Sequence, residues 1–370
     1  MILYLLITLV TVWLAYFVNN AIAEKTDFDR ICGRGSGWKT RREMLNGVFL
    51  TGIFLILFTV SALRVGIGSD YWVYRYDFLH IIDGDTKVSY EVGFKLLVRA
   101  LQGLFGYDNY KIIFAFMAFL TCLLFLKGLF AISDWFVMTF FLFMANGFYF
   151  MSFSNVRYYF VLAITAYAMK YLFQKDYVRF VAWIVFAAFF HKSVLLVIPA
   201  YLIAYYLKWN KKTIWLIPAV SLVLGFGKFI VRRLVFIFYP FYEGDPILDV
   251  ETISYVNIAK CFAILIFALL FYRKAIWGNP KAETFFNLNL FALLLYSLGY
   301  YIPETSRICY YLIFSHVYLI PIVLKSIEGK KKRLFFVTSV ILAYSGYLLI
   351  FLEKSKDGTV LLLPYLNWLL

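Results

Sequence analysis

The chain has 370 residues, 63% of them hydrophobic, with a mean hydropathy of +0.79 and a formal net charge of +15. This composition excludes an ordinary soluble domain, in which roughly 45–50% of residues are apolar. Apolar runs of about 20 residues recur along the sequence, each long enough to cross about 30 Å of hydrocarbon as a helix. Because only helices or closed barrels satisfy their backbone in lipid, and these runs are too long for barrel strands, we expect an all-α, polytopic transmembrane helical bundle.

In chain order, the runs predict roughly 10–12 spans within a single integral-membrane domain, 1–370. The expected crossings are 1–22, 46–63, 110–130, 134–150, 157–173, 178–207 as one or two spans, 213–225, 256–272, 285–301, 308–324 and 334–352. The loop 24–43 is basic, and we expect it on the cytoplasmic side because cytoplasmic loops are rich in lysine and arginine. Two larger segments, about 64–109 and 226–256, are then outside, and 94–105 is expected to be a short amphipathic helix.

The run from 181 to 207 allows two interpretations. A single span would bury His191 in mid-membrane and place Lys208, Lys211 and Lys212 outside. Two short spans joined at His191 keep these lysines, and the later basic loops, on the cytoplasmic side. The charge bias therefore favours two spans, with the His191 turn recessed below the outer surface.

This arrangement gathers polar residues at the outer ends of helices and in outer loops. They are Arg64, Asp70, Glu91, Arg157, His191, Arg232, Arg233, Glu304 and Arg307. Three arginines, at 64, 157 and 307, directly adjoin apolar runs. Because a guanidinium binds phosphate through two parallel hydrogen bonds, the three suit a diphosphate headgroup at the membrane surface. The alternative is that they are anchors whose side chains extend to the headgroups of surrounding lipids.

Several of these residues have the chemistry to act on a sugar substrate. His191 can take a proton from a hydroxyl near neutral pH, and Asp70 or Glu91 is an alternative base or a ligand for sugar hydroxyls. A hydrogen-bonded loop histidine is the simpler interpretation of His191. Tyrosines are dense on the outer side, either as an interfacial aromatic belt or as a platform for sugar rings. The residues that we assign to sugar binding are Tyr74, Tyr158 and Glu304.

Neither a metal nor a cofactor is expected. The four cysteines, at positions 32, 122, 261 and 309, are scattered and show no metal-binding spacing. Asp83-Gly84-Asp85 matches the DxD motif of metal-dependent glycosyltransferases, but its flanks are typical of an ordinary turn. The net positive charge lies mostly in short loops between spans, so no nucleic acid is expected as a partner.

Five segments occur in an order that resembles a known family. They read RVGIGSDYWVYRYDF (64–78), YEVGFKLL (90–97), NVRYYFVLAI (155–164), FFHKSVLL (189–196) and SRICYYLIFSHVYLIP (306–321). The set resembles the EpsG family, a branch of the Wzy-type polysaccharide polymerases of bacterial cell envelopes. The family often has glutamine after the arginine that matches Arg157, whereas this chain has Tyr158.

The resemblance implies a polymerase that joins oligosaccharide repeat units carried on undecaprenyl diphosphate, at the outer face of the bacterial cytoplasmic membrane. The lipid-linked oligosaccharide and membrane lipid are the implied partners, together with a chain-length regulator and a flippase of the same pathway. In this hypothesis Arg157, Arg307 and Arg64 stabilise the leaving diphosphate without a metal. His191 or Asp70, with Glu91 as a further candidate, accepts the proton.

Other functions are compatible with the same composition. A flippase for lipid-linked oligosaccharides would also bind a diphosphate, but it predicts polar residues through the midplane and often inverted repeats, which the sequence does not show. A membrane acyltransferase would need a cytoplasmic donor route, whereas the histidine is expected outside. A membrane glycosyltransferase with a polyprenyl-phosphate sugar donor is the nearest enzymatic alternative, and it often has an acidic pair in its first outer loop.

Overall fold

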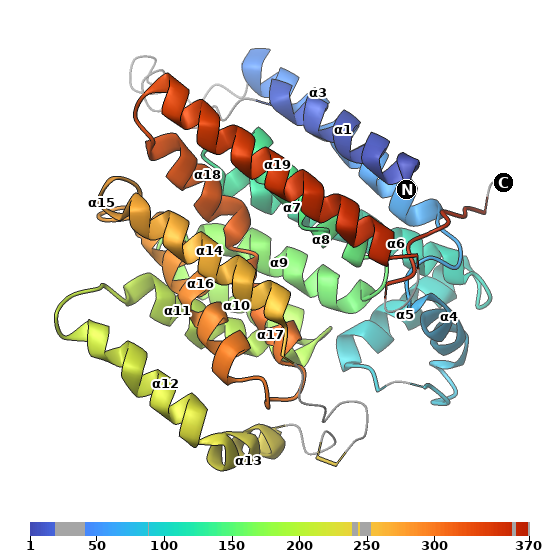
Figure 1. Ribbon diagram of the computed structural model, residues 1–370. Helices are drawn as coiled ribbons and strands as arrows, with labels where there is room; N and C mark the ends of the chain where they lie inside the picture. Colours follow the sequence, from blue (N-terminus) through green and yellow to red (C-terminus); the bar gives the residue numbers. More distant parts are fainter. Residues whose placement is uncertain (19–40, 88, 239–242, 245–252, 357–359, 369–370) are drawn as a thin grey trace, which may run out of the picture. The chain divides into compact units, whose positions relative to one another are not determined.

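The structure, a computed structural model, describes residues 1–18, 41–87, 89–238, 243–244, 253–356 and 360–368 (Figure 1). Over these ranges it is helical and forms no β-strand, and one isolated bridge joins Arg64 to Asn367. The predicted all-α class is therefore confirmed for this part of the chain. Most of the basic loop 24–43, with Cys32, lies outside the described residues.

The chain folds into two compact units, residues 1–192 with 334–370 and residues 193–333. The first contains α1 (Ile2–Phe17), α3 (Arg41–Leu63), α4 (Tyr71–His80), α5 (Val92–Phe105), α6 (Tyr110–Ile132), α7 (Phe136–Ala145), α8 (Phe148–Met151), α9 (Val156–Phe173) and α10 (Tyr177–Ala188). The second contains α11 (Val197–Tyr206), η3 (Thr213–Trp215), α12 (Leu216–Phe226), α13 (Lys228–Phe238), α14 (Tyr255–Leu270), α15 (Tyr272–Ala275), α16 (Pro280–Leu298), α17 (Thr305–Ile313) and α18 (His316–Ser326). The boundaries between the units fall within η2 (Lys192–Leu196) and α19 (Lys330–Lys354).

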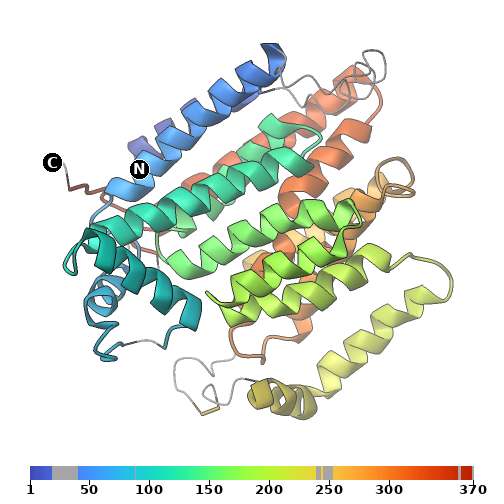
Figure 2. The same cartoon turned by 180° about the vertical axis from the view of Figure 1, so that it is seen from behind.

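In the first unit, α9 is the most enclosed long helix. It packs against α6 and α10, and α6 in turn packs against α3. Figure 2 shows α6 and α9 side by side from behind. Small side chains of α9, such as those of Ala163 and Ala166, are fully buried. Small residues let helix backbones approach closely in membranes, which explains this tight packing. The position of α9 fixes the polar residues at its N-terminus.

The C-terminal tail lies against the end of α3 in the same unit. The backbone N–H of Val65 donates to the carbonyl of Leu366 at 2.9 Å, and the N–H of Trp368 donates to Leu63 at 3.2 Å. The Tyr4 hydroxyl donates to the Leu362 carbonyl at 2.7 Å. The apolar tail is thus part of the packed first unit and helps enclose the segment that follows α3.

Two stretches of the first unit differ from the sequence-based expectation. The predicted span 134–150 is divided into α7 and α8, because Gly147 adopts a left-handed conformation with φ +77°. The outer segment 64–109, in which only the short helix 94–105 was expected, also contains α4. Its Tyr71, Tyr74 and Phe78 recur at helical spacing and are buried together, which stabilises the helix.

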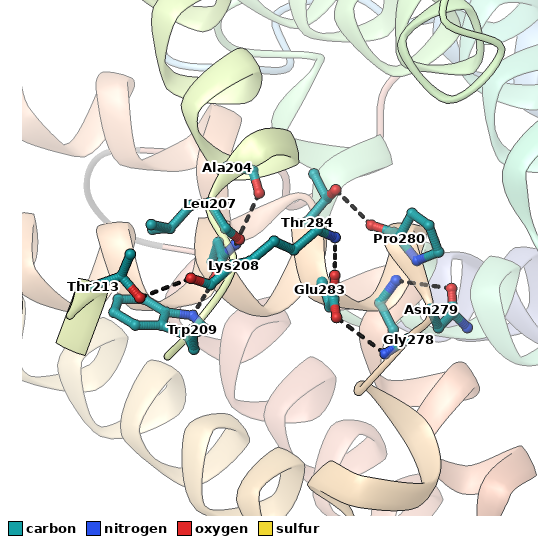
Figure 3. A network of polar contacts seen from close by, with 12 residues as sticks. Ala204, Leu207, Lys208, Trp209, Thr213, Gly278, Asn279, Pro280, Glu283 and Thr284 are labelled. Atoms are coloured by element: carbon teal, nitrogen blue, oxygen red, sulfur yellow. Dashed lines mark hydrogen bonds and ion pairs between the residues drawn. The ribbon is translucent and has the colours of Figure 1, made fainter. Parts of the chain in front are cut away.

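In the second unit, α16 is the helix that the others share, with α11, α12, α14, α17 and α18 as its neighbours. Polar contacts fasten the segment after α11 to the start of α16 (Figure 3). Lys208 forms an ion pair with Glu283, and the Trp209 indole N–H donates to Asn287 Oδ1 at 2.6 Å. The Asn287 amide donates to the Ala204 carbonyl at 2.8 Å. This network orders a loop that the charge bias assigns to the cytoplasmic side.

Four helical stretches of the described chain are long and apolar enough to cross a membrane. They are Arg42–Leu63, Tyr110–Ile132, Thr305–Ser326 and Lys330–Lys354, and a bent pair, Thr213–Phe226 with Lys228–Ile237, makes a possible fifth. Five further apolar helices have 10–17 residues, and the longest helix of that class would span only about 25 Å. The chain is therefore a multi-pass membrane protein by its apolar helices. The predicted ten to twelve crossings, the sidedness and the single 1–370 domain stay predictions.

The structure does settle one feature of the run from 181 to 207. Helix α10 ends at Ala188, and a new helical stretch begins at Lys192. His191 therefore lies in a break between helices and not in the middle of one continuous helix. The break predicted at this residue is confirmed.

Candidate functional site

The first turn of α9 places Arg157 in an aromatic and acidic environment within the first unit. Its Nη1 donates to Glu91 Oε2 at 2.5 Å. The guanidinium carbon lies 4.2 Å from the ring centre of Tyr90 and 5.5 Å from that of Phe94. The two charged side chains are only 11% and 15% exposed. An arginine paired with a carboxylate and stacked on rings in this way has little freedom to reorient.

Glu91 connects α9 to the turn that carries His191. It is the N-cap residue of α5, and its second oxygen, Oε1, accepts a hydrogen bond from the backbone N–H of Lys192 at 3.1 Å. Two residues on, the Gly93 N–H donates to the Phe189 carbonyl at 3.0 Å. A Cβ at Gly93 would lie 2.8 Å from that carbonyl oxygen, so only glycine permits this approach. The start of α5 is thereby fixed against residues 189–192.

His191 is half-buried in this turn, beside the residue that follows Arg157. Its ring centre is 5.6 Å from that of Tyr158, and the planes cross at 82°. The backbone N–H of His191 donates to the Ala187 carbonyl at 3.1 Å. The structure therefore brings four of the sequence-predicted site residues into one cluster. They are Glu91, Arg157, Tyr158 and His191.

Asp77 is a functional candidate that the sequence reasoning missed. Its carboxylate is fully buried and accepts hydrogen bonds from the Tyr90 hydroxyl at 2.5 Å and the Lys87 N–H at 2.8 Å. Burial, then the proximity of Tyr74 and the bond to Asp77, raises the pKa of the Tyr90 phenol, so the phenol keeps its proton and donates. Asp77 thus positions the ring against which Arg157 stacks. The available signal was its place on the buried face of α4, next to Phe78.

Two other predicted residues belong to α4. The hydroxyl of Tyr74, a buried residue, lies 3.5 Å from the backbone nitrogen of Arg157, which donates to it. Asp70 is the N-cap residue of α4 and accepts a hydrogen bond from the Ser69 hydroxyl at 3.0 Å. The Ser69 N–H donates to the Ser154 hydroxyl at 3.3 Å. Tyr74 therefore lies at the Arg157 cluster, and Asp70 lies one helical turn before it.

Arg64 has a different environment. Its side chain lies between the rings of Phe114 and Phe153, 5.1 and 5.0 Å from their centres, and the residue is only 3% exposed. Its Nη1 donates to the carbonyl oxygen and, at 3.1 Å, to the hydroxyl of Ser61. A diphosphate would reach this guanidinium only after those rings moved. In this conformation Arg64 has a structural role and stabilises the chain at the end of α3.

The remaining predicted residues, Glu304 and Arg307, lie in the second unit at the start of α17. Arg307 Nε lies 3.0 Å from Glu304 Oε2, and the two side chains are 36% and 26% exposed. Glu304, the N-cap residue, has a left-handed backbone with φ +54°. This is an uncommon conformation for a residue with a side chain. The convergence of Arg307 with Arg157 on a shared site stays a prediction.

The acidic pair of the DxD motif lies in the turn that follows α4. Asp85 accepts a hydrogen bond from the Tyr76 hydroxyl at 3.0 Å, and Asp83 accepts one from Tyr107 at 3.4 Å. Gly84 between them has φ +81°, as a tight turn requires. These contacts give the motif a local structural role.

The cluster at Arg157 combines a fixed guanidinium, a histidine and tyrosines, a set that suits recognition of a phosphorylated sugar carrier. No curated protein and no solved structure is similar enough to this chain to count as a match. The profile of the EpsG family, in contrast, matches residues 47–367, which include every residue of the cluster. The chain therefore belongs to the EpsG family, which is linked to exopolysaccharide biosynthesis.

Proposed function

We propose that this chain is a polysaccharide polymerase that joins repeat units carried on undecaprenyl diphosphate at the outer face of the cytoplasmic membrane. A hydroxyl of one lipid-linked repeat attacks the anomeric carbon of the first sugar on another lipid. The new glycosidic C–O bond forms as the C–O bond to the diphosphate breaks. The hydroxyl proton passes to a base on the enzyme, and the lipid diphosphate leaves with the bonding electron pair.

The observation that carries this proposal is the fixed geometry of Arg157. Glu91 and the rings of Tyr90 and Phe94 hold its guanidinium in place before any substrate binds. The Arg157 side chain is 11% exposed, so a small part of it remains accessible to a substrate. A preorganised donor near developing negative charge stabilises a transition state most strongly where water is excluded. The departing diphosphate carries such charge.

The ion pair with Glu91 has a consequence for substrate binding. Glu91 compensates the charge of Arg157, so the pair alone offers no net positive charge to a diphosphate. Additional cations are therefore needed. Lys192, which is exposed and whose backbone already contacts Glu91, supplies one, and Arg307 of the second unit is proposed to supply another. Arg64 is proposed to contribute to the diphosphate site only if its aromatic enclosure opens.

His191 is the base that the cluster favours among the three proposed candidates. Each oxygen of Glu91 already accepts a hydrogen bond, one from Arg157 and one from the Lys192 N–H, so Glu91 has a positioning role in the cluster. Asp70 lies a helical turn away from the Tyr74 hydroxyl that contacts Arg157. His191 lies beside Tyr158, which with Tyr74 and Glu304 is proposed to bind the sugars.

The proposal is tested by the products of the purified full chain. The protein is placed in lipid nanodiscs with lipid-linked repeat units isolated from the cells that make it. A polymerase yields a ladder of products that differ by whole repeat units and releases polyprenyl diphosphate. Addition of single sugars with release of polyprenyl monophosphate would show the alternative glycosyltransferase. Movement of intact lipid-linked units across vesicle membranes without ladder formation would show a flippase.

A further inference from the structure

The second unit contains a charged helix whose direction differs sharply from that of its neighbour. Helix α12 and the 3-10 turn before it are apolar, whereas α13 reads KFIVRRLVFIF and contains three cations. The axis turns by 80° between the two helices, a change of direction visible in Figure 1. A straight continuation of α12 would place Lys228, Arg232 and Arg233 in hydrocarbon, where charged residues are costly.

The bend is encoded at Gly227. Its N–H donates to the Val223 carbonyl at 2.8 Å and ends α12. A Cβ at this position would lie 2.2 Å from the same carbonyl oxygen, so any other residue would disturb the turn. The carbonyl of Gly227 then accepts from the N–H of Val231 at 2.9 Å, which starts α13. The change of direction is therefore specified by the sequence at Gly227.

The residues of α13 are divided between two faces. Ile230, Leu234 and Ile237 recur at i, i+4 and i+7 on one face, and each is more than half exposed. Lys228 and Arg232, one turn apart, lie on the opposite face, and Arg233 lies at the border between the faces. An exposed apolar face with cations opposite it is the pattern of helices that lie in the plane of a membrane interface.

The surroundings of the cations fit the headgroup region of a bilayer. The three cations of α13 line a hollow of about 1050 Å³, in which Glu243 is the acidic residue. Its apolar lining is Phe226, Phe229, Phe236 and Ile237, the last from the edge of the apolar face. The Arg232 guanidinium lies 5.2 Å from the ring centre of Phe236. Such a hollow offers positive charge to phosphate groups and aromatic surface to the adjoining glycerol and acyl carbons.

Tyrosines lie beside the junction between α12 and α13. The hydroxyl of Tyr301 donates to the Leu224 carbonyl at 2.8 Å and thereby links the end of α12 to the turn after α16. The Lys228 ammonium lies 5.9 Å from the ring centres of both Tyr300 and Tyr301. Tyrosine is enriched where a membrane meets water, so this junction has the composition of an interface.

We propose that α13 lies in the plane of the membrane interface and that Lys228, Arg232 and Arg233 bind the phosphate groups of anionic phospholipids. The apolar face with Ile230 inserts among the upper acyl carbons. Binding of this helix to the bilayer surface fixes the end of α12. The proposal concerns bulk anionic lipid and does not depend on the polymerase activity.

Spin labels at single cysteines from 229 to 237 test the orientation in the full chain reconstituted in nanodiscs, in a background without the native cysteines. Accessibility to oxygen and to a water-soluble nickel complex reports the depth of each label. A helix in the plane gives depths that oscillate with a period of about 3.6 residues, with positions 230, 234 and 237 deepest. A depth that changes steadily along the helix would overturn the proposal, as would labels that face water at every position.

Lipid charge tests the role of the cations. With a label at Ile230→Cys, added phosphatidylglycerol in phosphatidylcholine nanodiscs is expected to favour the inserted position by roughly fivefold per cation. The triple variant Lys228→Gln, Arg232→Gln and Arg233→Gln should lose this response. The matched control Lys330→Gln, Lys331→Gln and Lys332→Gln removes the same charge from an exposed helix start and should keep it. A triple α13 variant that responds like the parent would overturn the proposal.

Discussion

Two arginine–glutamate pairs, one in each unit, illustrate how the same chemistry serves different purposes. Arg157 and Glu91 are 66 residues apart in sequence, and their side chains are 11% and 15% exposed. Arg307 and Glu304 are three residues apart on one helix start, with exposures of 36% and 26%. The first pair exists only because the tertiary fold brings the start of α5 next to the start of α9. The second needs nothing beyond local backbone.

The difference concerns geometry more than stability. A buried ion pair contributes little net stability, because the loss of hydration offsets much of the attraction, yet removal of one partner is strongly destabilising. An exposed pair of neighbours on a helix is worth a few tenths of a kcal/mol. The long-range pair therefore fixes an enclosed guanidinium in one orientation, whereas the local pair with Glu304 holds a partly exposed one. Substitutions at the two pairs and at their neighbours test this contrast.

The largest effect is expected where the first cluster provides the base. His191→Gln preserves hydrogen bonding but cannot accept the proton, so the polymerisation rate should fall by about 10²–10⁴ while binding of the lipid-linked substrate survives. Product ladders give the rate, and native mass spectrometry gives the binding. His80→Gln is the matched control, since His80 stacks on Tyr76 outside the cluster. An active His191→Gln enzyme would transfer the role of base to Asp70 or Glu91.

The second effect separates the two acidic partners by stability. Glu91→Gln keeps an acceptor for the Lys192 N–H but leaves the enclosed charge of Arg157 uncompensated, and should cost about 3 kcal/mol of unfolding free energy. Glu304→Gln should cost about 0.2–1 kcal/mol, because its pair is exposed. Unfolding by sodium dodecyl sulfate in mixed micelles measures both. Equal losses of unfolding free energy in the two variants would show that the burial of the Arg157–Glu91 pair does not affect stability.

The third effect tests the support beneath Arg157. Tyr90→Phe retains the ring but removes a donor from the fully buried Asp77 carboxylate, and should cost about 1–3 kcal/mol of stability. It should also lower kcat more than it raises KM, because the ring aligns the guanidinium. Tyr107→Phe, which removes an exposed contact to Asp83, is the control and should stay within about 0.5 kcal/mol. Unchanged stability and kcat in Tyr90→Phe would show that the hydrogen bond to Asp77 does not help to position Arg157.

The smallest effect is expected at the local pair. Arg307→Lys keeps the positive charge, and the exposed position allows the lysine to reach Glu304 or a phosphate in several conformations. We expect a loss in polymerisation rate of at most about tenfold, or about 1.4 kcal/mol. The same product ladders provide the rate. A loss of 10²-fold or more would mean that Arg307 is held as rigidly in the working enzyme as Arg157.

Much of the fold could be predicted because apolar length and helical spacing are local signals. Helices α6 and α9 begin and end within two residues of the predicted runs, and the break at His191 followed from charge bias in distant loops. Helix α4 was missed because its buried face combines two tyrosines and a carboxylate with Phe78, and has no aliphatic residue. The division of 134–150 at Gly147 depended on a backbone conformation that composition alone does not specify.

The candidate site could be predicted only in part, for a related reason. Arg157 and His191 stood out because each is an ionisable residue beside an apolar run. The contact of Arg157 with Glu91 left no signal, since no local periodicity links residues so far apart in the chain. The enclosure of Arg64 between Phe114 and Phe153 likewise depends on tertiary packing. The sequence pattern identified the charged residues, whereas tertiary packing determines which of them contact one another.

The central claim is that Arg157 stabilises the leaving diphosphate through its fixed, forked guanidinium. The most direct test is the single-turnover polymerisation rate of Arg157→Lys in nanodiscs with saturating lipid-linked repeat units. Lysine keeps the charge but loses the paired donors, so the rate should fall by about 10²–10³. Arg179→Lys, at an exposed ion pair of the same unit, should retain the parent rate. Full activity of a stably folded Arg157→Lys enzyme would contradict the claim and leave Arg157 with only a structural role, as the ion-pair partner of Glu91.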